Sequence, residues 1–140
     1  MRVCDLAREE AEPVREFLAA NGWAHRVGNT ASFAALIRNS QRTAVVFDGN
    51  AVIGFARGIT DGLANGYLSR VAVAPAHQRR GLGRALVHHV MGDDAGVTWL
   101  LRAGRDDAPA FFEALGFRVS AMAMERERRR VSIDSEPRST

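Results

Sequence analysis

The chain has 140 residues, of which 46% are hydrophobic and 25% are charged, and its net charge is +3. These values are typical of a soluble globular domain that is large enough to bury a full core without disulfides or metals. The sequence has neither an apolar run long enough to cross a membrane nor a basic-then-apolar leader. The single cysteine, Cys4, cannot form an internal disulfide, which agrees with a reducing compartment. We therefore expect a cytoplasmic protein with no membrane partner.

The basic residues are all arginine, because the chain contains no lysine. Part of the positive charge lies at residues 126–130 and part at a glycine-rich turn, residues 78–84. No aromatic side chains suited to base stacking alternate with these arginines, so we expect no nucleic-acid partner. His88 and His89 have no further ligands at suitable spacing, so we expect no metal site.

The first half of the chain contains both helix and strand patterns. Apolar residues at helical spacing predict helices, and alternating residues bounded by turn signals predict strands. The expected elements are an edge strand at 2–6, helices at 8–20 and 32–38, and strands at 43–47 and 51–59. Asp48, Gly49 and Asn50 form a turn signal, so the last two strands should make a hairpin. Trp23 and His25 lie in the connection between the two helices.

The second half predicts a parallel strand pair joined by a helix. The expected elements are strands at 67–73 and 97–101, helices at 82–91 and 108–115, and closing strands at 117–119 and 122–128. A strand, helix and strand in this order should place strands 67–73 and 97–101 side by side and parallel. The fold class is therefore α+β (mixed α/β), with a mostly antiparallel sheet. We expect one domain over residues 1–131 and a polar, disordered tail over 132–140.

The turn between strand 67–73 and helix 82–91 should bind an anion. A helix N-terminus offers backbone N–H groups and the positive end of the helix dipole. Arg79, Arg80 and Arg84 surround it, and they would repel the dipole unless an anion were bound. A Walker A loop is excluded because it needs lysine, and a dinucleotide fingerprint is excluded because Leu86 stands where a third small residue is required.

Two blocks resemble a known family. The run Gln78-Arg79-Arg80-Gly81-Leu82-Gly83, directly after a strand, closely resembles the coenzyme A signature of the GCN5-related N-acetyltransferases (GNAT), Gln/Arg-x-x-Gly-x-Gly/Ala. Residues 108–117, APAFFEALGF, are similar to that family's later segment, a short helix with an aromatic pair that ends in Gly-Phe. The resemblance implies the GNAT fold, in which strands 67–73 and 97–101 splay apart, and acetyl-CoA as co-substrate.

The resemblance also implies roles for particular residues. The backbone of residues 71–73 would pair with the pantetheine arm, and backbone N–H groups from residues 79–84 would hold the pyrophosphate. The splay would arise from an irregularity such as a β-bulge. Trp23 and His25 would line the acceptor pocket or would simply pack within the loop that covers it. The implied cofactor-binding residues are Val71, Ala72, Val73, Gln78, Arg79, Arg80, Gly81, Leu82, Gly83, Arg84, Arg105 and Phe112.

Three positions depart from the family pattern. Phe112 stands where the family commonly has a tyrosine, the proposed general acid, and Arg105 stands where an asparagine is frequent. The strand that carries a glutamate base in some members offers only Ser69 and Arg70. Tyr67 and Ser69 are our catalytic candidates, and the other candidates are Asp61, His77 and Glu113.

The sequence thus predicts an acetyl-CoA-dependent N-acetyltransferase that acts on a primary amine of a small molecule by direct attack. The alternative is a catalytically weak acyl-CoA sensor or regulatory module, which the departures at Phe112 and the missing glutamate favour. Family resemblance also suggests a homodimer through the C-terminal strands.

Overall fold

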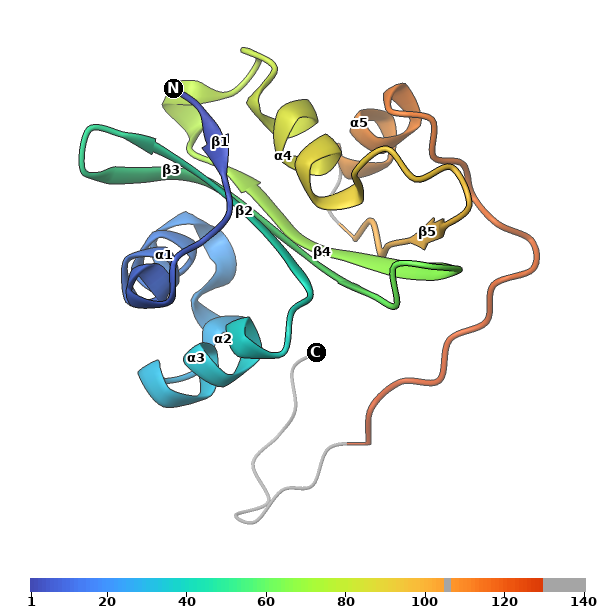
Figure 1. The fold of residues 1–140 in the computed structure, drawn as a ribbon, viewed down its shortest axis with the longest axis horizontal. Coiled ribbons are helices and arrows are strands. Elements are labelled where there is room, and N and C mark those ends of the chain that lie inside the picture. The colour runs from blue at the N-terminus through green and yellow to red at the C-terminus, as the bar shows by residue number, and fades with distance from the viewer. Residues whose placement is uncertain (105–106, 130–140) are drawn as a thin grey trace. The chain divides into compact units, whose positions relative to one another are not determined.

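A computed structural model describes residues 1–104 and 107–129 of the chain. The chain divides into two compact units, Met1–Gly104 and Arg105–Thr140, and the second is described here over residues 107–129. The first unit contains a five-stranded sheet with the strand order β1-β2-β3-β4-β5 (Figure 1). The strands are β1 (Val3–Cys4), β2 (Arg42–Asp48), β3 (Ala51–Thr60), β4 (Asn65–Val73) and β5 (Thr98–Leu100). The first four strands pair antiparallel, and β4 and β5 pair parallel.

Helices flank this sheet. They are α1 (Ala11–Leu18), α2 (Ala24–Val27), α3 (Thr30–Arg38) and α4 (Leu82–Met91), with short helical turns at Arg8–Glu10, Ala19–Trp23 and Pro75–His77. The predicted strands and helices of this unit are therefore confirmed, with shifted ends. The short α2 was missed because one helical turn that buries only Val27 is too brief to show a period.

One face of the sheet is covered by α1, α2 and α3 (Figure 1). Its core consists of buried side chains from these helices and from β2 and β3, including Val14, Phe17, Phe33, Val45 and Phe55. The amphipathic pattern of α1 produces this packing, because Ala11, Val14, Phe17 and Leu18 recur at helical spacing. Gly22, at φ +95°, then ends the first helical stretch in the left-handed region.

The opposite face is covered by α4, which buries Leu86, Val87 and Val90 (Figure 1). The glycines of β3 allow this close approach, since a Cβ on Gly54 would lie 3.0 Å from Leu86 and one on Gly58 would lie 2.5 Å from Val90. Arg42 on β2 donates from Nη1 to the Val90 carbonyl at 2.8 Å, which holds the C-terminal end of α4 against the sheet. Because α4 is held against the sheet, the position of the turn at residues 78–81, directly before it, is also fixed.

The second unit contains α5 (Ala108–Ala114), as predicted. The predicted closing strands at 117–119 and 122–128 are wrong, because residues 117–129 form no strand in this structure. Met122 and Met124, which alternate as core residues of a strand would, are 88% and 97% exposed. The hydroxyl of Ser120 accepts the N–H groups of Met122 and Ala123, both at 3.1 Å, so a side-chain turn replaces strand pairing there. The expected tail, residues 132–140, lies outside the described residues.

No helix among the described residues is long and apolar enough to cross a membrane.

Candidate functional site

The edge of β4 is open over most of its length. On its β5 side, β4 pairs only at three positions, from Asn65 opposite Thr98 to Tyr67 opposite Leu100. Beyond Tyr67, residues 68–73 have no strand partner on that side among the described residues. Backbone N–H and C=O groups on an open strand edge can pair with an extended ligand. This geometry is the splay that the sequence predicts.

A β-bulge lies in the middle of the open edge. Phe55 of β3 pairs with Ala72, and Arg57 pairs with Ser69, so the single residue Ala56 faces both Arg70 and Val71. Arg70 has φ +55°, in the left-handed region that non-glycine residues rarely adopt. Such a bulge bends a strand and increases its twist, and bulges are frequent beside active sites. The predicted irregularity is therefore confirmed, and it immediately precedes the backbone of residues 71–73.

The chain then enters the predicted anion-binding turn. The side chain of Gln78 donates from Nε2 to the Val73 carbonyl at 3.0 Å, so this residue holds the turn against the strand end. Arg79 (φ +66°) and Gly81 (φ +82°) are both left-handed, and Gly81 is the N-cap of α4. A Cβ on Gly81 would meet no atom within 4 Å, so the glycine serves the backbone conformation and leaves the approach open.

The N-terminus of α4 is electropositive. No side chain caps it, and its first turn contains no acidic residue. The N–H groups of Leu82, Gly83 and Arg84 precede the first intrahelical bond, from the Ala85 N–H to the Gly81 carbonyl at 3.0 Å. Arg79, Arg80 and Arg84 are exposed around this terminus. These groups together favour a bound anion.

The catalytic candidates Tyr67 and Ser69 lie on the face of the sheet opposite α4. Residues directly opposite in antiparallel strands point to the same face. Ser69 pairs with Arg57 and Tyr67 pairs with Ile59, and Phe55, two residues before Arg57, packs with α1 and α3. The structure thus brings Tyr67 and Ser69 together with Arg57, a buried cation that the sequence analysis did not identify as a site residue. Its signal was a lone charge within the apolar run of residues 51–60.

The other acid–base candidates have structural contacts. Asp61 Oδ1 accepts the N–H groups of Leu63, Ala64 and Asn65 at 2.9, 2.8 and 3.1 Å, so its carboxylate closes the β3–β4 turn. His77 Nε2 lies 3.3 Å from Asp48 Oδ2 and joins the turn before α4 to the β2–β3 turn.

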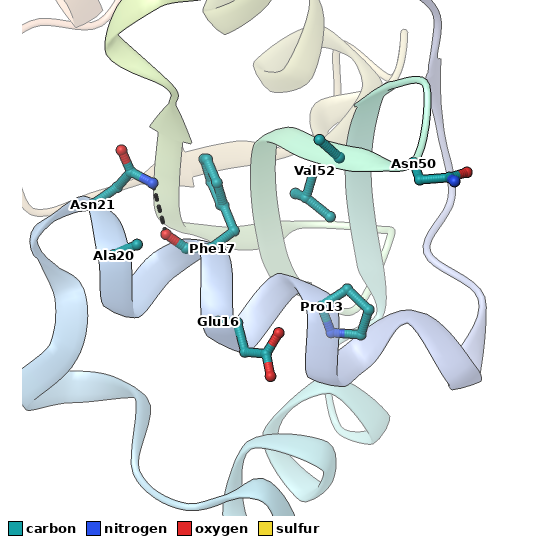
Figure 2. A pocket seen from close by; sticks show the side chains of 8 residues that line it. Pro13, Glu16, Phe17, Ala20, Asn21, Asn50 and Val52 are labelled. Atoms are coloured by element: carbon teal, nitrogen blue, oxygen red, sulfur yellow. Dashed lines mark hydrogen bonds between the residues drawn. The ribbon is translucent and has the colours of Figure 1, made fainter.

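The predicted acceptor residues Trp23 and His25 differ in their surroundings. Trp23 is half-buried and packs against the core under α1 and α3. His25 is exposed, and its Nε2 accepts from Arg26 Nε at 3.2 Å. Neither lines the pocket of about 350 Å³ between α1 and the β2–β3 turn (Figure 2). That pocket, which the sequence did not predict, is lined by Pro13, Glu16, Phe17, Ala20, Asn21, Asn50, Ala51 and Val52.

Of the predicted cofactor residues, Phe112 belongs to the second unit. Phe112 on α5 is half-buried and makes edge-to-face contacts with Phe111 and Phe117, at centroid distances of 4.9 and 5.7 Å. Glu113, on the same helix, is exposed. Arg105 lies outside the described residues. Among the residues that the structure does describe, no cluster of His, Cys, Asp or Glu could hold a metal ion.

Comparison with known proteins identifies the family. A family model described as an acetyltransferase (GNAT) domain matches residues 39–119, more than half of the chain. The chain belongs to the GNAT acetyltransferase family. This match includes the whole open edge of β4, the turn and α4, so the predicted family is confirmed.

Solved structures confirm the fold class. A GNAT-family acetyltransferase from Streptococcus pneumoniae TIGR4 has a TM-score of 0.73 and 21% identity, over 92% of this chain and 97% of that one. A GNAT-family protein from Xanthomonas campestris pv. campestris has a TM-score of 0.71 and 26% identity, over 91% and 92% of the two chains. A Bacillus halodurans protein described as a transcriptional regulator also shares the fold, with a TM-score of 0.70 and 16% identity over 91% and 99%. No curated protein sequence matches the chain.

Proposed function

We propose that this GNAT protein transfers the acetyl group of acetyl-CoA to a primary amine of a small molecule. The observation that carries the proposal is the continuity between the open, bulged edge of β4 and the electropositive N-terminus of α4. An extended chain that ends in a pyrophosphate would use both features at once. Family membership supports acetyl transfer, and the nature of the acceptor is our inference.

The residues of this segment suit coenzyme A. The backbone of Val71, Ala72 and Val73 would pair with the amides of the pantetheine arm, as one strand pairs with another. The backbone N–H groups of residues 79–84 would hold the pyrophosphate, with the surrounding arginines adding positive charge. Acetyl-CoA, when bound, supplies a thioester whose carbonyl carbon is the electrophile.

The side chains of this protein need supply little acid–base chemistry. The acceptor nitrogen forms a bond to the acetyl carbon, the carbon–sulfur bond breaks, and the amine loses one proton. A backbone N–H in the 71–73 run would donate to the carbonyl oxygen as negative charge develops on it. An alkyl thiol has a pKa of about 8.5, so its thiolate leaves without an obligatory acid. Tyr67 and Ser69 lie on the α1–α3 face of the sheet, which we take as the acceptor face, and they are the side chains we propose for proton transfer.

An amine panel tests this function. The protein is incubated with acetyl-CoA and amines of several classes, and free thiol is measured against a reaction without protein. We expect thiol release and an acetylated product, seen by mass spectrometry, with at least one small primary amine. If acetyl-CoA binds but no amine is acetylated, the alternative role as an acyl-CoA sensor replaces the proposed function.

A further inference from the structure

Among the residues that the structure describes, Arg57 is the one charged residue that is buried. The residue is only 7% exposed, and it lies in the middle of β3 on the α1–α3 face of the sheet. Burial of a guanidinium is costly unless the charge is paired and hydrogen-bonded. A cation retained at this position therefore requires a reason.

The neighbours of Arg57 supply one neutral hydrogen bond and no counter-charge. Its Nε donates to Ser40 Oγ at 2.8 Å. No carboxylate within the described parts of the chain forms an ion pair with it. Burial lowers the pKa of Arg57 and the nearby Tyr67 raises it, and neither effect comes from a carboxylate.

Ser40 fixes the direction of the guanidinium. Its hydroxyl donates to the Leu36 carbonyl at 2.8 Å, at the C-terminal end of α3, and so presents a lone pair to Arg57 Nε. Among the described residues, the bond from Nε to Ser40 is the one side-chain hydrogen bond that Arg57 makes, so Nη1 and Nη2 have no acceptor there. The guanidinium is thus held at Nε, and its two terminal nitrogens remain as donors for a further partner.

Arg57 lies beside the proposed catalytic side chains. Ser69 is its direct cross-strand partner, and Tyr67 is the diagonal neighbour on the same face. Both side chains are half-buried, so this part of the face is partly shielded from water. Shielding strengthens the attraction between a fixed cation and an anion that enters.

We propose that Arg57 binds a carboxylate of the acceptor, so that the acceptor class is a small amino carboxylate. The Nη1 and Nη2 donors form a fork that matches the two oxygens of a carboxylate. The carboxylate would provide the counter-charge that no described residue supplies to Arg57, and it would place the amine near Tyr67 and Ser69. This inference rests on the proposed function for the identity of the substrate, but the carboxylate site itself can be tested without turnover.

The binding test uses matched probes that differ in one charge. Glycine and glycinamide, and β-alanine and β-alaninamide, are titrated into protein labelled with ¹⁵N at arginine Nε, and Arg57→Gln identifies the Arg57 signal. We expect the carboxylate member of a pair to shift this signal and the amide member to leave it in place. An absence of any shift with all carboxylates, or an equal shift with carboxylate and amide, overturns the carboxylate site.

A kinetic test adds the effect on transfer. For acetylated pairs, Arg57→Gln should lower kcat/KM for the carboxylate by ~10–100-fold and change that for the amide by less than about twofold. Arg57→Lys, which keeps the charge and loses the fork, should fall between wild type and Arg57→Gln. Arg38→Gln removes the same charge from an exposed site on α3 and should change neither substrate. Equal losses for both members of a pair would overturn the inference.

The two proposals fail in different ways. If no amine releases thiol, the proposed transfer is wrong, and the titration of the Arg57 signal still decides whether a carboxylate binds. If neutral amines are acetylated as efficiently as amino carboxylates by the wild-type protein, the transfer stands and the role of Arg57 is wrong.

Discussion

At the residue scale, Asp61 is a catalytic candidate whose carboxylate has a structural role in a turn. It is exposed, and its Oδ1 accepts three backbone N–H groups at the start of the β3–β4 turn. The hydrogen bonds from Ala64, Leu63 and Asn65 hold the pKa of Asp61 below its ordinary value. We therefore assign this side chain to the turn that positions the first residues of β4.

The lowered pKa of Asp61 predicts a pH-dependent stability. Because the folded pKa lies below the unfolded one, the stabilisation is present above the unfolded pKa and is lost as the pH falls through the folded pKa. Urea midpoints of wild type and Asp61→Asn should therefore differ most at neutral pH and converge in acid. A difference that stays constant from neutral pH to about pH 3 would contradict this role.

A second residue-scale prediction concerns Gly66 on β4. A Cβ at this position would lie 2.6 Å from the ring of Trp99 on β5, and the indole also approaches Gly58. A rigid ring cannot give way cheaply, so Gly66→Ala should lower the free energy of unfolding by about 1–3 kcal/mol. Gly104→Ala, where a Cβ would meet nothing within 4 Å, is the matched control and should stay within about 0.5 kcal/mol. Chemical denaturation measures both, and equal stabilities for the two variants would refute the packing account.

At the element scale, α3 matters because its C-terminal end presents Ser40 to Arg57. Its N-terminal end is closed by a reciprocal pair of bonds: Asn29 Oδ1 accepts the Ser32 N–H at 2.8 Å, and Ser32 Oγ accepts the Asn29 N–H at 3.1 Å. Such caps satisfy helix N–H groups that have no intrahelical partner.

Removal of this cap should destabilise the protein by a predictable amount. Asn29→Ala should cost about 1 kcal/mol of unfolding free energy, measured by urea denaturation, because the Ser32 N–H loses its acceptor. Asn29→Asp keeps an acceptor oxygen at the helix N-terminus and should retain most of the stability. If Asn29→Asp loses as much as Asn29→Ala, the cap is not the source of the effect.

The elements that the sequence predicted well are those with local signals. The period of α4 and the glycines that bound it mark its ends, and a strand, a helix and a strand in order predicted the parallel pairing of β4 and β5. The bulge at Arg70 and Val71 was expected only as an irregularity, because the mismatch between β3 and β4 appears in their register and not in either strand alone. The sequence did not predict the roles of Arg57 and Trp99 for the same reason, because each role depends on contacts with residues that are distant in sequence.

At the scale of the whole molecule, the first unit carries the open strand edge, the anion-binding turn and the proposed acceptor face. The alternation in residues 122–128 predicted a strand, but no pairing over these residues accompanies it in this structure, and their methionines remain exposed. Periodicity predicts which side chains would share a face, whereas a strand forms only when a partner edge is paired. The single-domain assignment and the homodimer stay predictions.

Acetyl-CoA binding to purified protein, measured by isothermal titration calorimetry, tests the central claim most directly. We expect one bound acetyl-CoA per chain. Gly83→Trp should abolish binding by filling the approach to the α4 N-terminus, while His88→Trp, at an exposed position near the other end of α4, should leave it unchanged. Circular dichroism should show that both variants fold. Tight binding to Gly83→Trp, or no binding to the wild-type protein, would contradict the placement of coenzyme A along β4 and α4.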